Sequence, residues 1–250
     1  ADGLPERHAA SFSLLYYASS WLKYHHPGIF ACALLNAQPM GFYAPAQIVR
    51  DARAHGVQLR PICVNASYWD NVMEPDGTGG LALRLGFRQI QAMREEDVAW
   101  LTAARGHGYQ DVEAVWRKAG VSPKMIQALA EADAFHSLGL SRREALWAAK
   151  ALTAERPLPL FAQDLEGESI AEDPAYLPQM TEGEEVVEDY VSTRLTLRAH
   201  PVALIRHRLT PGMGQSPAAP TVLGASEDQK PDLIVKHRPA HSDSHLRLVR

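Results

Sequence analysis

This 250-residue sequence is poor in cysteine, has no long hydrophobic run and carries no large excess of charge. Its two cysteines, Cys32 and Cys63, lack ligand-like spacing, so we expect buried reduced thiols and no disulfide framework. No apolar run reaches the roughly 18 residues that a membrane-spanning helix needs, which predicts no membrane partner. Because the formal net charge is −4, any nucleic-acid contact must come from local sites and not from a global field.

Several catalytic signatures are also missing. The chain has no Gly-rich phosphate loop, no dinucleotide-binding fingerprint, no Gly-x-Ser-x-Gly elbow and no Asp-x-Asp pair of the kind that holds two metal ions. His241 and His245 have i, i+4 spacing, but their segment is not convincingly helical and has no glutamate in the catalytic position between them. We therefore predict no catalytic residue and no metal ligand, and the lack of a secretory signal predicts a cytoplasmic location.

The first 36 residues have helical periodicity. Apolar and aromatic side chains recur at the spacing of one helix face, which predicts a buried stripe. The residues of this stripe are Phe12, Leu15, Tyr16, Ser19 and Leu22. Pro27 ends the first predicted helix and begins a second over residues 28–36. A plain helical hairpin in a core would explain the pattern, and the missing initiator Met leads us to expect a piece of a longer protein.

The middle of the chain is predicted to be mainly helical, with a small α+β part. Turn residues and local periodicity predict a helix at 45–55, a short strand at 57–64, a turn at 65–70 and a hairpin tip at 76–80. A long helical stretch follows at 81–152, with breaks at 106–108 and 120–123.

The last third is predicted to be partly irregular. Residues 164–189 contain ten carboxylates and no Lys or Arg, which indicates a solvated, partly flexible linker. We expect this linker to lead into a helix over 182–193, with the acidic run at 182–189 as solvated surface. A compact segment follows at 195–206, and the Pro-, Gly-, Ser- and His-rich residues 210–250 are expected to be disordered.

One hairpin in the helical stretch has the chemistry of a phosphate site. Gly120 can adopt positive φ, Ser122 can cap the next helix, and Pro123 suits its first position. Such a turn directs backbone N–H groups outward at a helix N-terminus, where an anion is favoured, and Lys124 adds positive charge. This is the helix-hairpin-helix pattern, which holds a DNA backbone without reading sequence; a purely structural helical turn is the alternative.

An upstream segment, residues 90–101, aligns with this hairpin as a degenerate copy. Ala92 and Arg94 replace the usual glycines, so close approach of the backbone to a phosphate is in question there.

A Pro-stiffened stretch at 156–161 indicates a different kind of contact. Leu158, Leu160 and Phe161 lie in an extended, otherwise polar segment, which is typical of a peptide that docks in a partner's groove. A linker folded back on the helical domain is the alternative.

Ordered motifs along residues 1–209 resemble those of the bacterial C-family replicative polymerases, the DNA polymerase III alpha subunits. The matching strings are Arg-His-Ala-Ala-Ser-Phe at 7–12, Trp-Leu-Lys-Tyr-His-His-Pro at 21–27, and Phe30. The error-prone, damage-tolerant branch is more similar still, at residues 34–43, 60–70, 182–190 and 197–201.

This resemblance implies a domain order. Residues 1–80 would be the distal fingers region, 81–152 a tandem helix-hairpin-helix DNA-binding domain, and 153–209 an acidic, Pro-rich linker with a short helix that leads toward a missing oligonucleotide-binding domain. Residues 210–250 would be a divergent tail. The family's catalytic aspartates lie in a palm upstream of residue 1, so we expect a C-terminal fragment without polymerase activity of its own, with Mg²⁺ confined to that palm.

The resemblance also implies partners and contacts. Primer-template DNA would meet seven residues, which are Arg7, His8, Lys23, His25, Gly120, Ser122 and Lys124. Replicative members carry a sliding-clamp peptide after the hairpin domain, and residues 157–161 occupy the matching place without its leading Gln. Clamp or accessory mutagenesis proteins are thus candidate partners of Leu158, Leu160 and Phe161. Two other functions stay open: a free-standing DNA-binding module, and an interaction scaffold for a mutagenesis complex.

Overall fold

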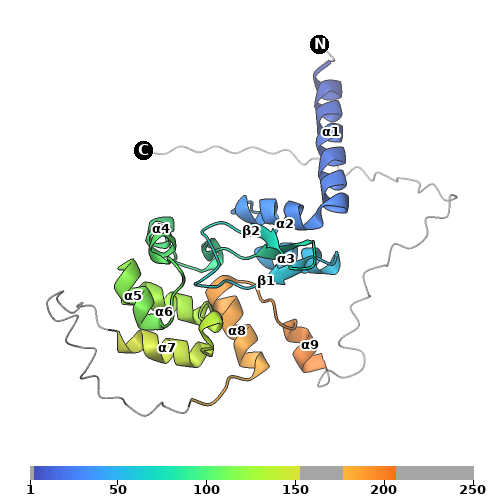
Figure 1. Cartoon of the computed structure of the whole chain (residues 1–250). Helices are drawn as coiled ribbons and strands as arrows, with labels where there is room; N and C mark the ends of the chain where they lie inside the picture. Colours follow the sequence, from blue (N-terminus) through green and yellow to red (C-terminus); the bar gives the residue numbers. More distant parts are fainter. Residues whose placement is uncertain (1–2, 153–176, 207–250) are drawn as a thin grey trace, which may run out of the picture. The chain divides into compact units, whose positions relative to one another are not determined.

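The computed structural model describes residues 3–152 and 177–206, all within one of the two units into which the chain divides (Figure 1). The side chains of residues 3–9 are not part of this description. The predictions for Leu158, Leu160 and Phe161, for the tail 210–250 and for its histidines therefore lie outside the described residues.

Helices make up most of the described chain, with one small sheet between them. The helices are α1 (Gly3–His25), α2 (Pro27–Asn36), α3 (Pro45–Ala54), α4 (Glu95–Ala104), α5 (Val112–Ala119), α6 (Pro123–Glu131), α7 (Arg142–Ala151), α8 (Glu182–Thr193) and α9 (Pro201–Ile205). Short 3-10 turns occur at η1 (Phe87–Gln89) and η2 (His136–Leu138). The prediction of a mainly α fold with a small α+β part is confirmed.

The sheet has three strands, β1 (Gln58–Arg60), β2 (Val72–Pro75) and β3 (Leu81–Arg84), in the order β1-β3-β2. The central strand, β3, pairs in parallel with β1 and antiparallel with β2. Residues 76–80 form the predicted hairpin tip, in which Asp76 Oδ1 accepts hydrogen bonds from the Thr78 N–H (2.7 Å) and the Gly80 N–H (2.9 Å). The prediction that residues 81–84 are helical was wrong, because strands on both sides satisfy their backbone groups.

One continuous hydrophobic core joins the sheet to α2 and α3 on one side and to the helices α4 to α7 on the other. Leu35, Leu83, Leu101, Ile126 and Leu129 in this core are fully buried. The two cysteines also lie buried and free, as the sequence predicts. The sheet and the helical hairpins therefore fold around the same interior.

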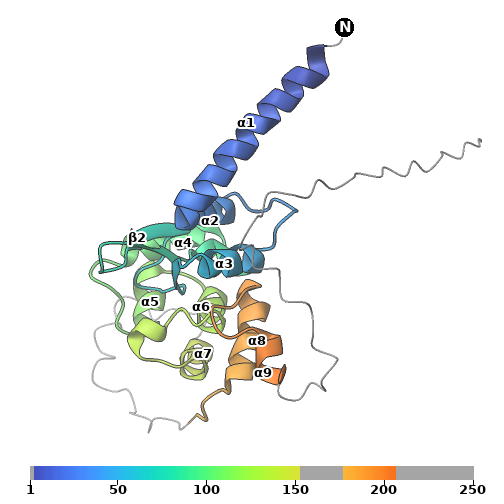
Figure 2. The ribbon, with the colours of Figure 1, turned by 90° about the vertical axis from the view of Figure 1, so that its right-hand side faces the viewer.

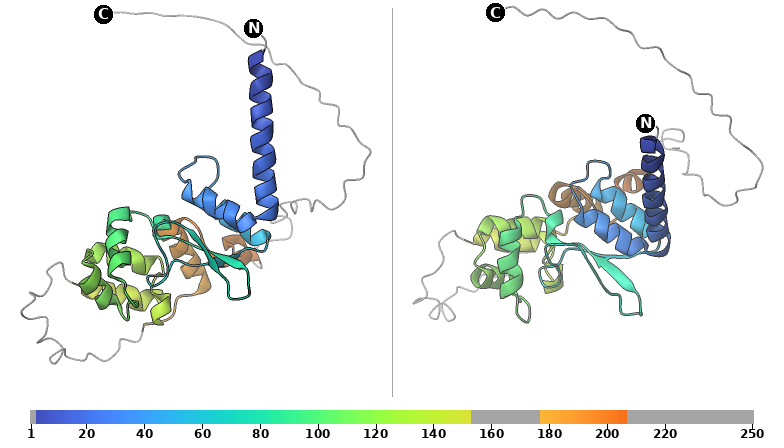
Figure 3. Two further views of the ribbon diagram at one scale, coloured as in Figure 1. Left: turned by 45° about the horizontal axis from the view of Figure 1, so that its top comes forward. Right: turned by 90° about the horizontal axis from the view of Figure 1, so that it is seen from above.

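The first helix forms as predicted, but its apolar stripe is not buried. Phe12, Leu15, Tyr16 and Leu22 are 41–75% exposed. Figures 1, 2 and 3 show why: α1 meets the rest of the described chain only near its C-terminal end, next to α2. Helical spacing was correctly predicted, whereas burial was not, because burial needs a second element opposite the stripe and the described chain places none there.

A close backbone approach fixes the end of β3. The amide of Gly86 donates to Asn71 Oδ1 (3.0 Å), and a Cβ at residue 86 would lie only 2.3 Å from the carbonyl oxygen of Trp69. Asn71 in turn donates from its side chain to Asn36 Oδ1 (2.7 Å). The sheet is thereby joined to the end of α2.

The sheet also carries a shared carboxylate. Glu74 on β2 accepts hydrogen bonds from Arg84 Nε on β3 (2.9 and 3.0 Å) and from Arg60 on β1 (2.5 Å), so that one side chain ties all three strands. The hydrogen bond from Arg84 is the largest of the interactions that lower the pKa of Glu74, and Arg60 adds to it.

This arrangement predicts how stability depends on pH. Because the folded pKa of Glu74 is depressed, its contribution to stability is complete above the unfolded value of roughly 4.3 and is lost as the pH falls through the folded value. We expect Glu74→Gln to flatten the acid side of the stability curve, measured by urea unfolding between neutral pH and about pH 3. The matched control is Glu113→Gln, which removes a half-exposed carboxylate paired to Arg117. An equal flattening in both variants would contradict the assignment of this pH dependence to Glu74.

Candidate nucleic-acid interface

The second hairpin joins α5 to α6 through three residues. Gly120 ends α5 with φ 68°, and its N–H donates to the carbonyl of Trp116 (3.1 Å). Ser122 caps α6 by accepting the N–H of Met125 at its Oγ (3.3 Å). Lys124 is exposed in the first turn of α6, which contains no carboxylate. Three of the predicted site residues thus lie together at the positive end of a helix, an arrangement that suits an anion.

The first hairpin joins η1 to α4 and has a left-handed residue at the position aligned with Gly120. Ala92 has φ 60°, in the left-handed region that Gly120 also occupies, so the predicted alignment of the two segments holds in the backbone. Arg94 is the N-cap of α4, but its side chain makes no cap and instead binds both oxygens of Asp97 (2.9 and 3.0 Å). Glu95 and Glu96 add two further carboxylates to this first turn.

The first hairpin also has a protein neighbour. The N–H of Gln91 donates to the carbonyl of Ser192 (2.9 Å), and its side-chain amide donates to the carbonyl of Val191 (2.6 Å), both at the C-terminal end of α8. Arg194, the C-cap of α8, lies 3.4 Å from Gln91 Oε1.

The predicted contacts on α1 are distributed differently. Lys23 is paired with Asp51 of α3 at 3.1 Å, and both side chains are about half exposed. His25 is exposed, and its ring lies 4.6 Å from that of Trp21. The side chains of Arg7 and His8 lie outside the described residues. The residues predicted to bind DNA therefore fall into two sets, one at the second hairpin and one on α1. The hairpin residues form a single surface.

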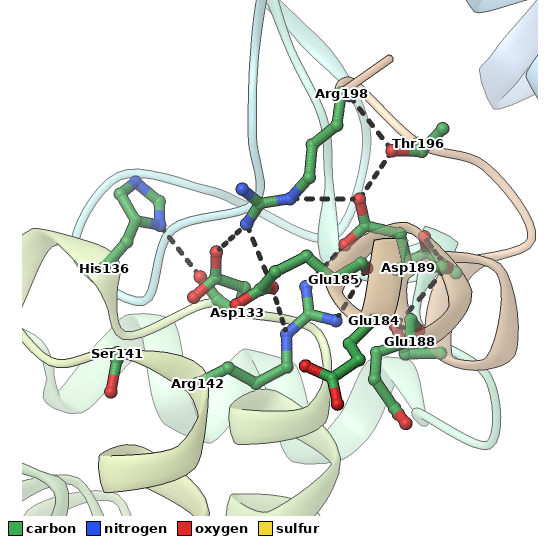
Figure 4. A network of polar contacts seen from close by, with 12 residues as sticks. Asp133, His136, Ser141, Arg142, Glu184, Glu185, Glu188, Asp189, Thr196 and Arg198 are labelled. Carbon is green, nitrogen blue, oxygen red and sulfur yellow. Dashed lines mark hydrogen bonds and ion pairs between the residues drawn. The ribbon is translucent and has the colours of Figure 1, made fainter. Parts of the chain in front are cut away.

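A buried polar network holds α8 against the hairpin helices (Figure 4). The side chain of Arg142, in the first turn of α7, is fully buried, with its guanidinium on Asp189 Oδ1 and its Nε 3.3 Å from Glu185 Oε2. Arg198 adds pairs to Asp133 (2.9 Å), Glu185 (3.2 Å) and Asp189 (3.5 Å). These contacts tie α7, the end of α6 and the segment after α8 to α8 itself.

The network corrects one prediction about the acidic run. Helix α8 spans Glu182–Thr193, the range that the sequence predicts, but the run at 182–189 is not simply solvated surface. The side chains of Glu185 and Asp189 are only 15% exposed and are both paired with arginines. Their partners are distant in sequence, so the charge run alone could not reveal them.

The hairpins lie in a segment that matches a known motif family: residues 56–145 match the helix-hairpin-helix motif. The prediction of a helix-hairpin-helix segment is confirmed. Two hairpins lie within that range, one at residues 90–94, before α4, and one at 120–122, before α6.

A longer stretch of the chain is similar to error-prone DNA polymerases. It is 64% identical over 211 residues to an error-prone DNA polymerase of Ruegeria pomeroyi, with 84% of this chain and 19% of the relative aligned. It is 54% identical over 215 residues to error-prone DNA polymerase 2 of Rhizobium meliloti, with 83% and 20% aligned. It is 50% identical over 207 residues to an error-prone DNA polymerase of Brucella abortus, with 83% of this chain and 19% of the relative aligned.

The chain is therefore homologous to a C-terminal part of error-prone DNA polymerases, as the motif resemblance predicts. It spans about a fifth of the length of these relatives.

Two further observations concern the described ranges alone. No group of three His, Cys, Asp or Glu side chains within residues 3–152 and 177–206 is placed to share a metal ion. None of the helices in those ranges combines the length and the apolar character required for crossing a bilayer.

Sequence reasoning missed the end of α8 as a neighbour of the first hairpin. The contact joins residues far apart in the chain, and no local pattern at Gln91 or Ser192 announces it. The charge contrast between the two hairpins was visible in the sequence, since Glu96 aligns with Lys124 once Ala92 is aligned with Gly120.

The buried network predicts a large effect on stability. In Arg142→Ala, the carboxylates of Glu185 and Asp189 would lose their buried partner, which typically costs about 3–5 kcal/mol. The matched control is Arg143→Ala on the same helix, whose 35% exposed side chain pairs with Glu184, and it should cost less than about 1 kcal/mol. Chemical denaturation of both variants measures the difference in the free energy of unfolding. Equal decreases would show that the buried pairing of Arg142 stabilises the fold no more than the exposed pairing of Arg143.

Proposed function

We propose that this chain binds the sugar-phosphate backbone of duplex DNA and serves as a primer-template-binding part of an error-prone DNA polymerase. The observation that carries the proposal is the second hairpin. There a left-handed glycine, a capping serine and an exposed lysine meet at a helix N-terminus without a carboxylate. Helix-hairpin-helix matching and the polymerase relatives support the same function. A role on bacterial DNA would place the chain in the cytoplasm.

The physical basis is electrostatic. The first turn of α6 has a partial positive charge from its aligned peptide dipoles, and Lys124 adds a full charge beside it. A phosphate bound there releases condensed counterions, which makes the affinity depend on salt and not on base sequence. Gly120 and Ser122 shape the turn, whereas Lys124 supplies the charge.

On α1, the proposal assigns Lys23 and His25, with Arg7 and His8, to contacts near the fingers helices. Lys23 would have to share its charge between Asp51 and a phosphate. These four contacts are part of the proposal and are independent of the hairpin.

We propose no cofactor for this chain, because holding a DNA backbone is a binding step that needs none. Mg²⁺ would belong to the palm of the whole enzyme. A sliding clamp or an accessory mutagenesis protein is the proposed partner of Leu158, Leu160 and Phe161. Loss of clamp binding in a triple Ala variant, with DNA affinity unchanged, would support that partner.

The DNA-binding role has a direct test. We expect Lys124→Ala to weaken binding of a fluorescein-labelled duplex about tenfold at low salt, because a charge-assisted hydrogen bond contributes roughly 1.5 kcal/mol. The slope of log K against log salt should fall by about one. The control is Lys150→Ala, an exposed lysine at the end of α7 on the side of α8. If Lys124→Ala leaves both affinity and slope unchanged, the second hairpin does not bind DNA.

The division between binding and catalysis has its own test. The chain spans about a fifth of its polymerase relatives, and we propose that this fifth contributes binding and no nucleotidyl transfer. A primer-extension assay with the chain, Mg²⁺ and all four nucleotides should yield no product. Primer elongation would contradict this division. Co-purification with a polymerase chain that carries a palm would distinguish the proposed role from that of a free-standing DNA-binding module.

A further inference from the structure

The two hairpins share a left-handed residue followed two positions later by the N-cap of a helix. Ala92 and Gly120 both have left-handed φ, at 60° and 68°. The helices that follow also bury matching residues, because Val98 and Leu101 of α4 stand where Ile126 and Leu129 stand in α6. The backbone alone therefore gives both turns the same capacity to present N–H groups to an acceptor.

Their charges are opposite. The first turn of α4 contains Glu95, Glu96 and Asp97, whereas the first turn of α6 contains no acidic residue. Glu96 stands at the position of Lys124. Arg94 is adjacent to the three carboxylates and is bound to Asp97 through two hydrogen bonds. A phosphate at the first hairpin would meet like charges, which disfavour its binding.

The first hairpin already has an acceptor. The N–H of Gln91 donates to the carbonyl of Ser192, and the side chain of Gln91 donates to the carbonyl of Val191. The last carbonyls of a helix lack intrahelical donors and carry the partial negative charge of its dipole. The end of α8 thus offers partially negative carbonyls together with the guanidinium of Arg194, 3.4 Å from Gln91 Oε1, and it tolerates nearby carboxylates better than a phosphate would.

The position of α8 is set independently of this contact. Arg142 and Arg198 bind Glu185 and Asp189 on α8, two to seven residues before the carbonyls that meet Gln91 (Figure 4). The buried network therefore directs the end of α8 at the first hairpin.

We propose that the two hairpins have separate ligands: the first binds the C-terminal end of α8, and only the second binds DNA. The tandem unit then holds duplex DNA by one hairpin, and the first hairpin is an internal docking surface for a helix C-terminus. This inference rests on the proposed DNA-binding function and specifies which surface carries it.

The test compares the two hairpins within the full chain. Arg94→Ala removes the cation next to the first turn of α4, and Lys124→Ala removes the cation at the second hairpin. We expect Arg94→Ala to change the Kd for a labelled duplex less than twofold, with the salt slope unchanged, whereas Lys124→Ala lowers the slope by about one. A slope reduced by both variants would overturn the inference. An effect of neither variant would instead contradict the proposed function.

Hydrogen exchange supplies a second readout, and its comparison with and without DNA uses the unmodified chain. Duplex DNA should slow exchange at residues 120–126 and leave residues 91–97 unchanged. In the free chain, Gln91→Ala should speed exchange at least threefold at residues 190–194, without changing DNA affinity. Gln110→Ala, at an exposed loop glutamine, is the matched control. DNA-induced protection at residues 91–97 would overturn the inference, as would unchanged exchange at 190–194 in Gln91→Ala.

Discussion

The buried guanidinium of Arg142 is the interaction on which the arrangement of the hairpin region depends. Removing a charge from water is costly, and close carboxylates are needed to offset that cost. Glu185 and Asp189 supply them from α8, so α8 has to lie against α7 with these two side chains facing inward. The same carboxylates accept Arg198, which brings the following segment back toward the end of α6.

Once α8 is placed, its C-terminal carbonyls reach the first hairpin. Two turns that share a left-handed residue then face different chemistry: one faces a helix end, and the other presents Lys124 in a first helical turn that contains no carboxylate. The left-handed turn is kept although Ala92 stands where glycine is favoured, so a repeat can keep this conformation while its surface charges diverge, and ligand preference depends on the exposed charge.

Local sequence patterns predicted the elements well where the residues themselves determine the structure. The bounds of α8, the helix break at Gly120 and the capping role of Ser122 all follow from side chains within a few positions. Predictions failed where the answer depended on distant residues. The stripe on α1 has correct helical spacing but no covering element in the described chain, and residues 81–84 are a strand because β1 and β2 flank them.

The sequence by itself determined the helix-hairpin-helix segment, the similarity to error-prone DNA polymerases and the hairpin residues proposed to meet a phosphate. Short-range chemistry and ordered motifs carry that information. Only the tertiary structure decided that the acidic residues of α8 are buried partners and that the first hairpin holds a helix end. Both facts arise from contacts between residues that are remote in the chain, and pairing across such separations leaves no local pattern to read.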